Sequence, residues 1–111
     1  FCWPLKNIDG LTNLTNLTTI FLECYALENV DGLINSTSMT SLELIDCRAL
    51  KSVDGLANMT NLKSLTLMDC KVLKNIDGLV NLTNLTRLDL TGCYKLRPEP
   101  FDENNGYRCW C

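Results

Sequence analysis

Leucines and polar residues alternate in short stretches that recur along the chain. Between Leu62 and Cys70, Leu65 and Leu67 are separated by a single polar residue, which is the period of a strand with one buried face. Segments of the same form occur at residues 17–24, 39–47 and 85–93. We therefore expect four strands of about four residues each, joined by turns and loops.

The strands belong to a repeat unit of 22 or 23 residues. Asp-Gly-Leu begins at Asp9, Asp31, Asp54 and Asp77. Cysteines keep the same spacing, at Cys2, Cys24, Cys47, Cys70 and Cys93. A coil of this length cannot bury its own leucines, so we expect equivalent coils to stack with one parallel strand each. The Asp-Gly pairs mark turns opposite the strands, where we expect glycine to supply a positive φ.

The unit Leu-x-x-Leu-x-Leu-x-x-Cys-x-x-Leu resembles a leucine-rich repeat, with cysteine where many members of that family have asparagine. The resemblance covers about residues 2–93, and the run from Leu79 to Thr86 is similar to internalin-type repeats of bacterial surface proteins. The Cys-x-x-Leu step at Cys47 and Cys70 is closer to plant immune-receptor repeats and other cysteine-containing subfamilies. The resemblance implies an α/β fold: a right-handed solenoid of about four coils, with a parallel sheet on the concave face and irregular or 3-10 structure on the convex side. It also implies macromolecular binding without catalysis.

The two ends of the predicted solenoid differ. Residues 1–93 are expected to form a partial first coil and four repeats, and residues 94–111 a cysteine-containing cap that breaks the repeat with two prolines. The chain begins in mid-repeat with neither a starting methionine nor a signal sequence, so we expect a processed product or a fragment. Only Phe1 and Trp3 are available to cover the first strand, which favours a preceding segment or another subunit at that end.

The resemblance places the regularly spaced cysteines inside the solenoid as a ladder, one at the end of each strand: Cys2, Cys24, Cys47, Cys70 and Cys93. Buried, non-reactive thiols are the favoured interpretation. Disulfides along the ladder are the alternative, although stacked side chains that point the same way pair poorly. Cys109 and Cys111 lie outside the repeat and are candidates for a disulfide, either to Cys93 or to another chain.

Six asparagines stand in Asn-x-Ser/Thr sequons, the acceptor sites of N-linked glycans: Asn13, Asn16, Asn35, Asn58, Asn81 and Asn84. Four of them form one column just ahead of the strands, on the convex side. This pattern favours a secreted protein with a stripe of N-linked glycans, and we expect no other cofactor. The alternative is a solvated turn that leads into each strand, as in unglycosylated bacterial repeats.

The outward positions of the strands predict a concave face of small and polar residues. Its candidate binding residues are Phe21, Glu43, Ile45, Thr66, Met68, Arg87 and Asp89. The face lacks the cluster of Tyr, Trp and Arg that is typical of tight interfaces, so we expect it to be largely solvated. Glycan hydrolysis by Glu43 and Asp89, or a calcium site at Asp46 and Asp69, is a weaker alternative, and we expect neither catalytic residues nor a metal.

Composition excludes several classes of function. The chain contains no histidine, so it cannot hold a Ser-His-Asp or Cys-His nucleophile system or an imidazole zinc site. A formal net charge of −3 argues against nucleic-acid binding, and no apolar run reaches the roughly 20 residues of a membrane span. A 46% hydrophobic content predicts a folded domain.

Together these features predict a non-catalytic extracellular or cell-surface glycoprotein. The leading hypothesis is a structural module whose copies stack end to end into a fibril or surface layer. The alternative is a ligand-recognition ectodomain, such as an adhesin or an immune-type receptor fragment, that binds through the concave face. A cytosolic repeat fragment with reduced cysteines is a third hypothesis.

Overall fold

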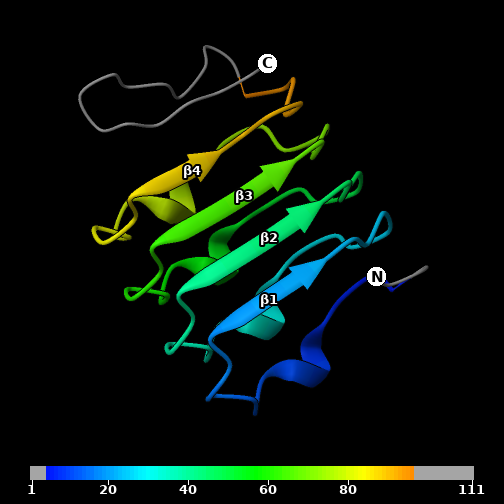
Figure 1. The fold of residues 1–111 in the computed structure, drawn as a ribbon. Helices are drawn as coiled ribbons and strands as arrows, with labels where there is room; N and C mark the ends of the chain where they lie inside the picture. The colour runs from blue at the N-terminus through cyan, green and yellow to red at the C-terminus, as the bar shows by residue number, and fades with distance from the viewer. Residues whose placement is uncertain (1–4, 97–111) are drawn as a thin grey trace.

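The computed structural model describes residues 5–96 and shows consecutive coils stacked side by side (Figure 1). In this part of the chain, the strands are β1 (Thr19–Leu22), β2 (Ser41–Ile45), β3 (Ser64–Met68) and β4 (Arg87–Asp89). They form one parallel sheet in the order β1-β2-β3-β4. Each strand lies where the alternation of leucine and polar residues predicts it.

Some predicted features lie outside the described residues: Cys2, Cys109, Cys111 and residues 97–111 of the expected cap. Residues 94–96 still follow the repeat, because Leu96 is buried and its backbone N–H donates to the carbonyl of Cys93 at 3.2 Å. Leu73 and Cys70 make the corresponding bond one coil earlier. The repeat pattern therefore extends to Leu96.

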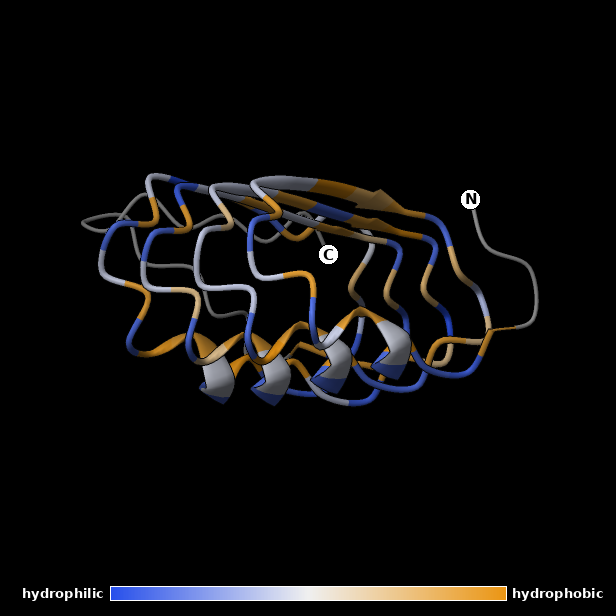
Figure 2. Ribbon diagram, turned by 90° about the horizontal axis from the view of Figure 1, so that it is seen from below, coloured by the Kyte–Doolittle hydropathy of each residue, from blue (hydrophilic) through white to orange (hydrophobic). Residues whose placement is uncertain are grey.

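Short 3-10 helices form the layer opposite the sheet (Figure 2). They are η1 (Asp9–Leu11), η2 (Asp31–Leu33), η3 (Asp54–Leu56) and η4 (Asp77–Leu79). Each opens with a backbone N–H that donates to a side chain two residues earlier, as from Asp9 to Asn7 Oδ1 and from Asp54 to Ser52 Oγ, both at 3.1 Å. Residues 5–96 contain no α-helix, so the helical part of the fold consists of these single turns.

Leucines between the two layers form a continuous column. Leu42 pairs with Leu65, and Leu65 with Leu88, in the register of the sheet, and all three are at most 4% exposed. Leu44 and Leu67 form a second pair that is fully buried. Burial of one leucine side chain contributes roughly 1.5–3 kcal/mol, so this column is the main source of stability.

Backbone hydrogen bonds link the coils outside the sheet as well. Before the strands, Lys63 N donates to Thr40 O at 2.9 Å. After the strands, Glu28 N donates to Lys6 O at 2.9 Å, and Lys51 N donates to Glu28 O at 3.1 Å. These ladders join equivalent residues of successive coils, so a coil of different length would leave backbone groups unpaired. They explain why the repeat length varies so little.

Close packing of coils, and not a positive φ, explains the glycines of Asp-Gly-Leu. Among the described glycines only Gly92 has a positive φ, of 79°, so the expectation of a positive φ in the Asp-Gly turns is wrong. A Cβ atom on Gly32 would lie 1.9 Å from the carbonyl oxygen of Ile8, and one on Gly55 would lie 2.4 Å from that of Val30. Each oxygen belongs to the preceding coil. Glycine is therefore needed because the neighbouring backbone leaves no room for a side chain.

Candidate binding face of the sheet

The outward side chains of the sheet stand in rows because the strands pair in register. The middle row consists of Phe21, Glu43, Thr66 and Asp89, which are Cα partners across β1, β2, β3 and β4. Successive side chains of a strand point to opposite faces. Since the neighbouring leucines point into the core, the middle row points outward and brings four residues from four coils together.

Exposure differs strongly along the middle row. Phe21 is 53% exposed, Glu43 is exposed and Asp89 is half-buried. Thr66 is only 7% exposed, although it points outward. Its hydroxyl group has no hydrogen-bond partner among the described residues. Thr66 therefore forms the floor of the row, with a carboxylate on the strand to either side.

The remaining predicted face residues flank the middle row. Ile45 pairs with Met68 at the carboxyl ends of β2 and β3, and both are half-buried. Arg87 is exposed and pairs with Ser64 at the opposite end of the strands. The face is thus apolar along one edge and basic at one corner, and it carries its carboxylates between them.

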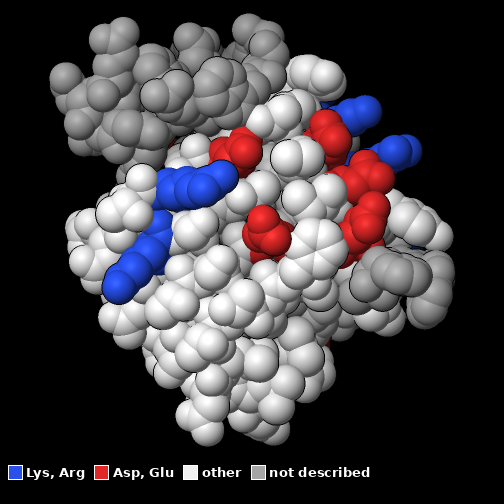
Figure 3. Space-filling view, viewed as in Figure 1, with Lys and Arg blue, Asp and Glu red and all other residues white. Residues whose placement is uncertain are grey.

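Acidic side chains gather on this side of the molecule (Figure 3). On the strands and just after them they are Glu23, Glu43, Asp46, Asp69 and Asp89. Within residues 5–96, the one ion pair joins Arg48 Nε to Asp46 Oδ1 at 2.7 Å. Glu43 and Asp89 have no basic partner in this part of the chain. The middle row therefore presents two negative charges that the described protein does not neutralise.

Comparison with known proteins identifies the fold. No protein-family model matches the chain, and a search of curated proteins finds no match. Among solved structures, an internalin from Listeria monocytogenes is similar, with a TM-score of 0.68 and 29% sequence identity over 77% of this chain and 25% of the internalin chain. The chain has the fold of a leucine-rich-repeat protein.

A leucine-rich-repeat solenoid accounts for the arrangement of the face. Stacked repeats create extended concave surfaces, and repeat proteins use these surfaces for binding. This fold therefore implies a protein-interaction module. The described chain spans about a quarter of the internalin that it resembles, so the similarity concerns the repeats. Its described helices are all too short to cross a membrane.

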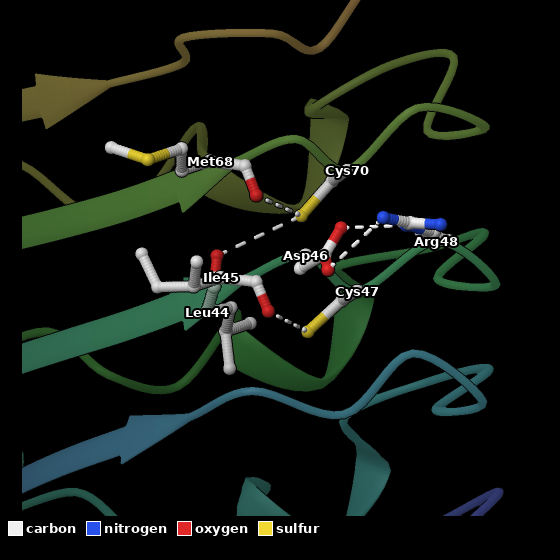
Figure 4. A network of polar contacts seen from close by, with 7 residues as sticks. All are labelled: Leu44, Ile45, Asp46, Cys47, Arg48, Met68 and Cys70. Atoms are coloured by element: carbon white, nitrogen blue, oxygen red, sulfur yellow. Dashed lines mark hydrogen bonds and ion pairs between the residues drawn. The ribbon is translucent and has the colours of Figure 1, made fainter. Parts of the chain in front are cut away.

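The cysteines of the leucine-rich repeat lie inside the solenoid, after each strand: Cys24, Cys47, Cys70 and Cys93 are 0% exposed. Figure 4 shows Cys70 Sγ beside two carbonyl oxygens, Leu44 O of the preceding coil at 3.8 Å and Met68 O at 3.9 Å. Cys93 Sγ donates to Leu67 O, also one coil back, at 2.7 Å. The ladder thiols therefore help to join successive coils as weak donors.

Burial and contact with the neighbouring thiols keep Cys70 protonated. The pKa of Cys70 is raised, because hydrogen bonds with Cys47 and Cys93 and burial all favour its neutral form. Cys47 and Cys70 carry free thiols. The thiolate is the reactive form of cysteine, so an inaccessible and protonated thiol has a structural role here.

We expect a maleimide reagent to label Cys47 and Cys70 only after the protein unfolds. Both side chains are fully buried, so labelling in native buffer should be at least about 100-fold slower than in guanidinium chloride. Mass spectrometry of peptides after timed labelling measures both rates. Similar rates in the two conditions would contradict the buried ladder.

Asp46 and Asp69 have structural roles after β2 and β3. Both adopt a left-handed backbone conformation, with φ of 58° and 59°, which aspartate tolerates better than most residues. Asp46 N donates to Met68 O of the next coil at 2.7 Å, and the Asp46 carboxylate pairs with Arg48 (Figure 4). Gly92 follows β4 at the same repeat position. Among the described residues, no group of three or more acidic or cysteine side chains is placed to hold a metal ion.

All six sequon asparagines are exposed: Asn13, Asn16, Asn35, Asn58, Asn81 and Asn84. Three of them also link coils through Nδ2, the atom to which an N-glycan is attached. Asn84 Nδ2 donates to Thr60 O at 2.8 Å, and Asn35 and Asn58 make the equivalent contact to earlier coils. Asn61, which is not part of a sequon, makes the same kind of hydrogen bond to an earlier coil. Asparagine therefore has a packing role in these columns that sequence analysis did not identify.

Proposed function

We propose that this leucine-rich-repeat chain is a non-catalytic, extracellular module that binds a protein through its concave sheet face. The observation that supports the proposal is the middle row, with an exposed Phe21 ring beside carboxylates that form no ion pair among the described residues. A protein that covers the row would bury the ring and pair the charges, and both changes favour binding. The carboxylates of Glu43 and Asp89 stand on strands that are separated by β3, and we assign them to binding.

We expect a Glu43→Arg variant to lose the partner that the wild-type protein captures from extracellular extracts. Reversal of a charge within the binding face should lower affinity by at least about tenfold. Glu28→Arg is the matched control, because Glu28 is exposed on a loop away from the sheet. Quantitative pull-down with both variants measures the effect. Equal capture by wild type and Glu43→Arg would overturn the proposal.

The extracellular assignment also leads us to propose N-linked glycans on the convex side. Asn13, Asn16 and Asn81 are exposed, and their side-chain amides make no hydrogen bond within residues 5–96. A glycan at these positions removes no contact between coils. Asn35, Asn58 and Asn84 use Nδ2 to hold the coils together, so we assign the glycans to Asn13, Asn16 and Asn81.

We expect enzymatic removal of N-glycans to lower the intact mass of the protein isolated from its natural source. Peptide mapping should place the sugars at Asn13, Asn16 and Asn81. Asn13→Gln should remove one glycan without loss of stability, whereas Asn58→Ala should destabilise the fold by roughly 1 kcal/mol. An intact mass that does not change on treatment would overturn the glycan assignment.

End-to-end assembly is a second candidate function, favoured by the first coil. Leu11, Leu17, Ile20 and Leu22 are only partly buried, whereas their counterparts in the second and third coils are fully buried. Another coil, in this chain or in a second copy, would cover them as later coils cover one another. Sedimentation velocity over a range of concentrations tests the candidate: larger species at higher concentration support it, and a monomer throughout overturns it.

A further inference from the structure

We propose that the middle row binds a basic side chain of the partner, lysine or arginine, between the carboxylates of Glu43 and Asp89. This inference rests on the proposed function and specifies the chemistry of its ligand. The positive group would lie above Thr66, and the stem of the side chain would run along the face. The proposal depends on the spacing of the strands, on the charge of the two carboxylates, on the Thr66 hydroxyl and on the Phe21 ring.

The spacing of the strands suits a basic side chain. Glu43 pairs with Thr66, and Thr66 with Asp89, so one strand lies between the two carboxylates. Neighbouring strands are about 4.8 Å apart, which places the Cα atoms of Glu43 and Asp89 roughly 10 Å apart. Outward side chains stand nearly perpendicular to a sheet, so the gap remains open above Thr66. An ammonium or guanidinium group fits this gap, whereas a calcium ion needs carboxylate oxygens at 2.3–2.6 Å.

The charges around the gap are not balanced by the described chain. Arg48 pairs with Asp46, and no other ion pair occurs within residues 5–96. Asp89 Oδ1 accepts a hydrogen bond from Thr91 N at 3.0 Å, which holds the carboxylate in place without neutralising it. Figure 3 shows basic side chains on two opposite sides of the acidic ones, and among the described residues none of them forms an ion pair with Glu43 or Asp89. A cationic ligand is therefore attracted to the row.

The Thr66 hydroxyl is an independent sign of a polar ligand. Thr66 is 7% exposed, and among the described residues its hydroxyl has no hydrogen-bond partner. The hydroxyl is not one of the fully buried polar atoms that lack a partner, so it opens toward the row, where a donor can approach it. Lysine and arginine side chains supply such N–H donors and no acceptors. A positive group above Thr66 thus lies between the two carboxylates and can donate to the hydroxyl below.

Phe21 extends the same row and adds an apolar contact. It pairs with Glu43 in the sheet, and its ring is 53% exposed. The methylene stem of lysine or arginine packs well on an aromatic ring. The row therefore offers contacts to both parts of a basic side chain.

NMR titration of the ¹⁵N-labelled chain tests the proposal. The probes are acetylated and amidated peptides Gly-Gly-Lys-Gly-Gly and Gly-Gly-Arg-Gly-Gly, with norleucine in the central position as the uncharged control. We expect shift changes centred on the amides of Glu43, Thr66 and Asp89, and none with the norleucine peptide. A variant with Glu43→Gln and Asp89→Asn should bind at least about tenfold more weakly, whereas Glu28→Gln should bind as wild type does.

Shift changes spread over all acidic residues, or equal binding by the double variant, would overturn the proposal. The natural partner separates this result from failure of the proposed function. If Phe21→Ala loses the partner but the double variant keeps it, the face binds a protein and the basic-ligand proposal is wrong. If the basic peptides bind the row while Phe21→Ala and Glu43→Arg both keep the partner, the proposed function is wrong.

Discussion

Leu67→Ala is expected to lower the free energy of unfolding by roughly 2–5 kcal/mol. Leu67 is fully buried in β3, with coils on both sides, so truncation leaves a cavity that the stacked neighbours cannot fill. Leu14→Ala is the matched control, because Leu14 is 46% exposed and should change stability by less than about 0.5 kcal/mol. Urea unfolding followed by circular dichroism measures both variants. Equal losses of stability in the two variants would contradict a buried leucine column between the sheet and the turns.

Gly32→Ala is expected to destabilise the fold by more than about 3 kcal/mol, since the new Cβ would lie 1.9 Å from Ile8 O. Gly78→Ala should cost less, because its nearest contact is Val53 O at 2.8 Å. Gly10→Ala meets nothing within 4 Å and should be neutral or slightly stabilising.

All three substitutions fall in the same Asp-Gly-Leu sequence. Thermal unfolding of the three variants measures how much each one destabilises the fold. If Gly32→Ala does not fold at all, the comparison of Gly78→Ala with Gly10→Ala still tests the argument. A Gly10→Ala variant as unstable as Gly78→Ala would show that the turn conformation, and not contact between coils, demands glycine.

The alternation of leucine with polar residues was enough to predict the strands and the stacking of coils. Leu65 and Leu67 need a buried face, and a coil of 23 residues finds one only against another coil. The reason for the glycines could not be predicted in the same way. Within one repeat, Gly32 resembles any turn glycine, and only the backbone of the preceding coil shows why a side chain is excluded.

The left-handed backbone conformation of the residue that follows the strands could be predicted from the sequence. Asp46, Asp69 and Gly92 stand at the same repeat position, and each belongs to a residue type that tolerates a positive φ. That alignment predicts a tight bend after β2, β3 and β4. The first repeat is one residue shorter at this point, after Leu22, so it has no equivalent residue.

The candidate site was predictable as a set of outward positions, but not as a binding site. Strand alternation places Glu43, Thr66 and Asp89 on one face, and the parallel register follows from the repeat length. The burial of Thr66 and the pairing of Arg48 with Asp46 depend on how side chains of different coils pack. These two facts are part of the basis on which we propose that the face, expected from the sequence to be largely solvated, binds a cationic group.

The stacking of in-register coils is the central claim, and nuclear Overhauser effects between backbone protons test it most directly. In labelled protein, the account predicts cross-strand contacts between the amide and α protons around Leu42 and Leu65, and again around Leu65 and Leu88, in the pattern of parallel strands. Contacts between residues three or four apart along these segments, as in an α-helix, would contradict it. So would an antiparallel pattern between the same strands.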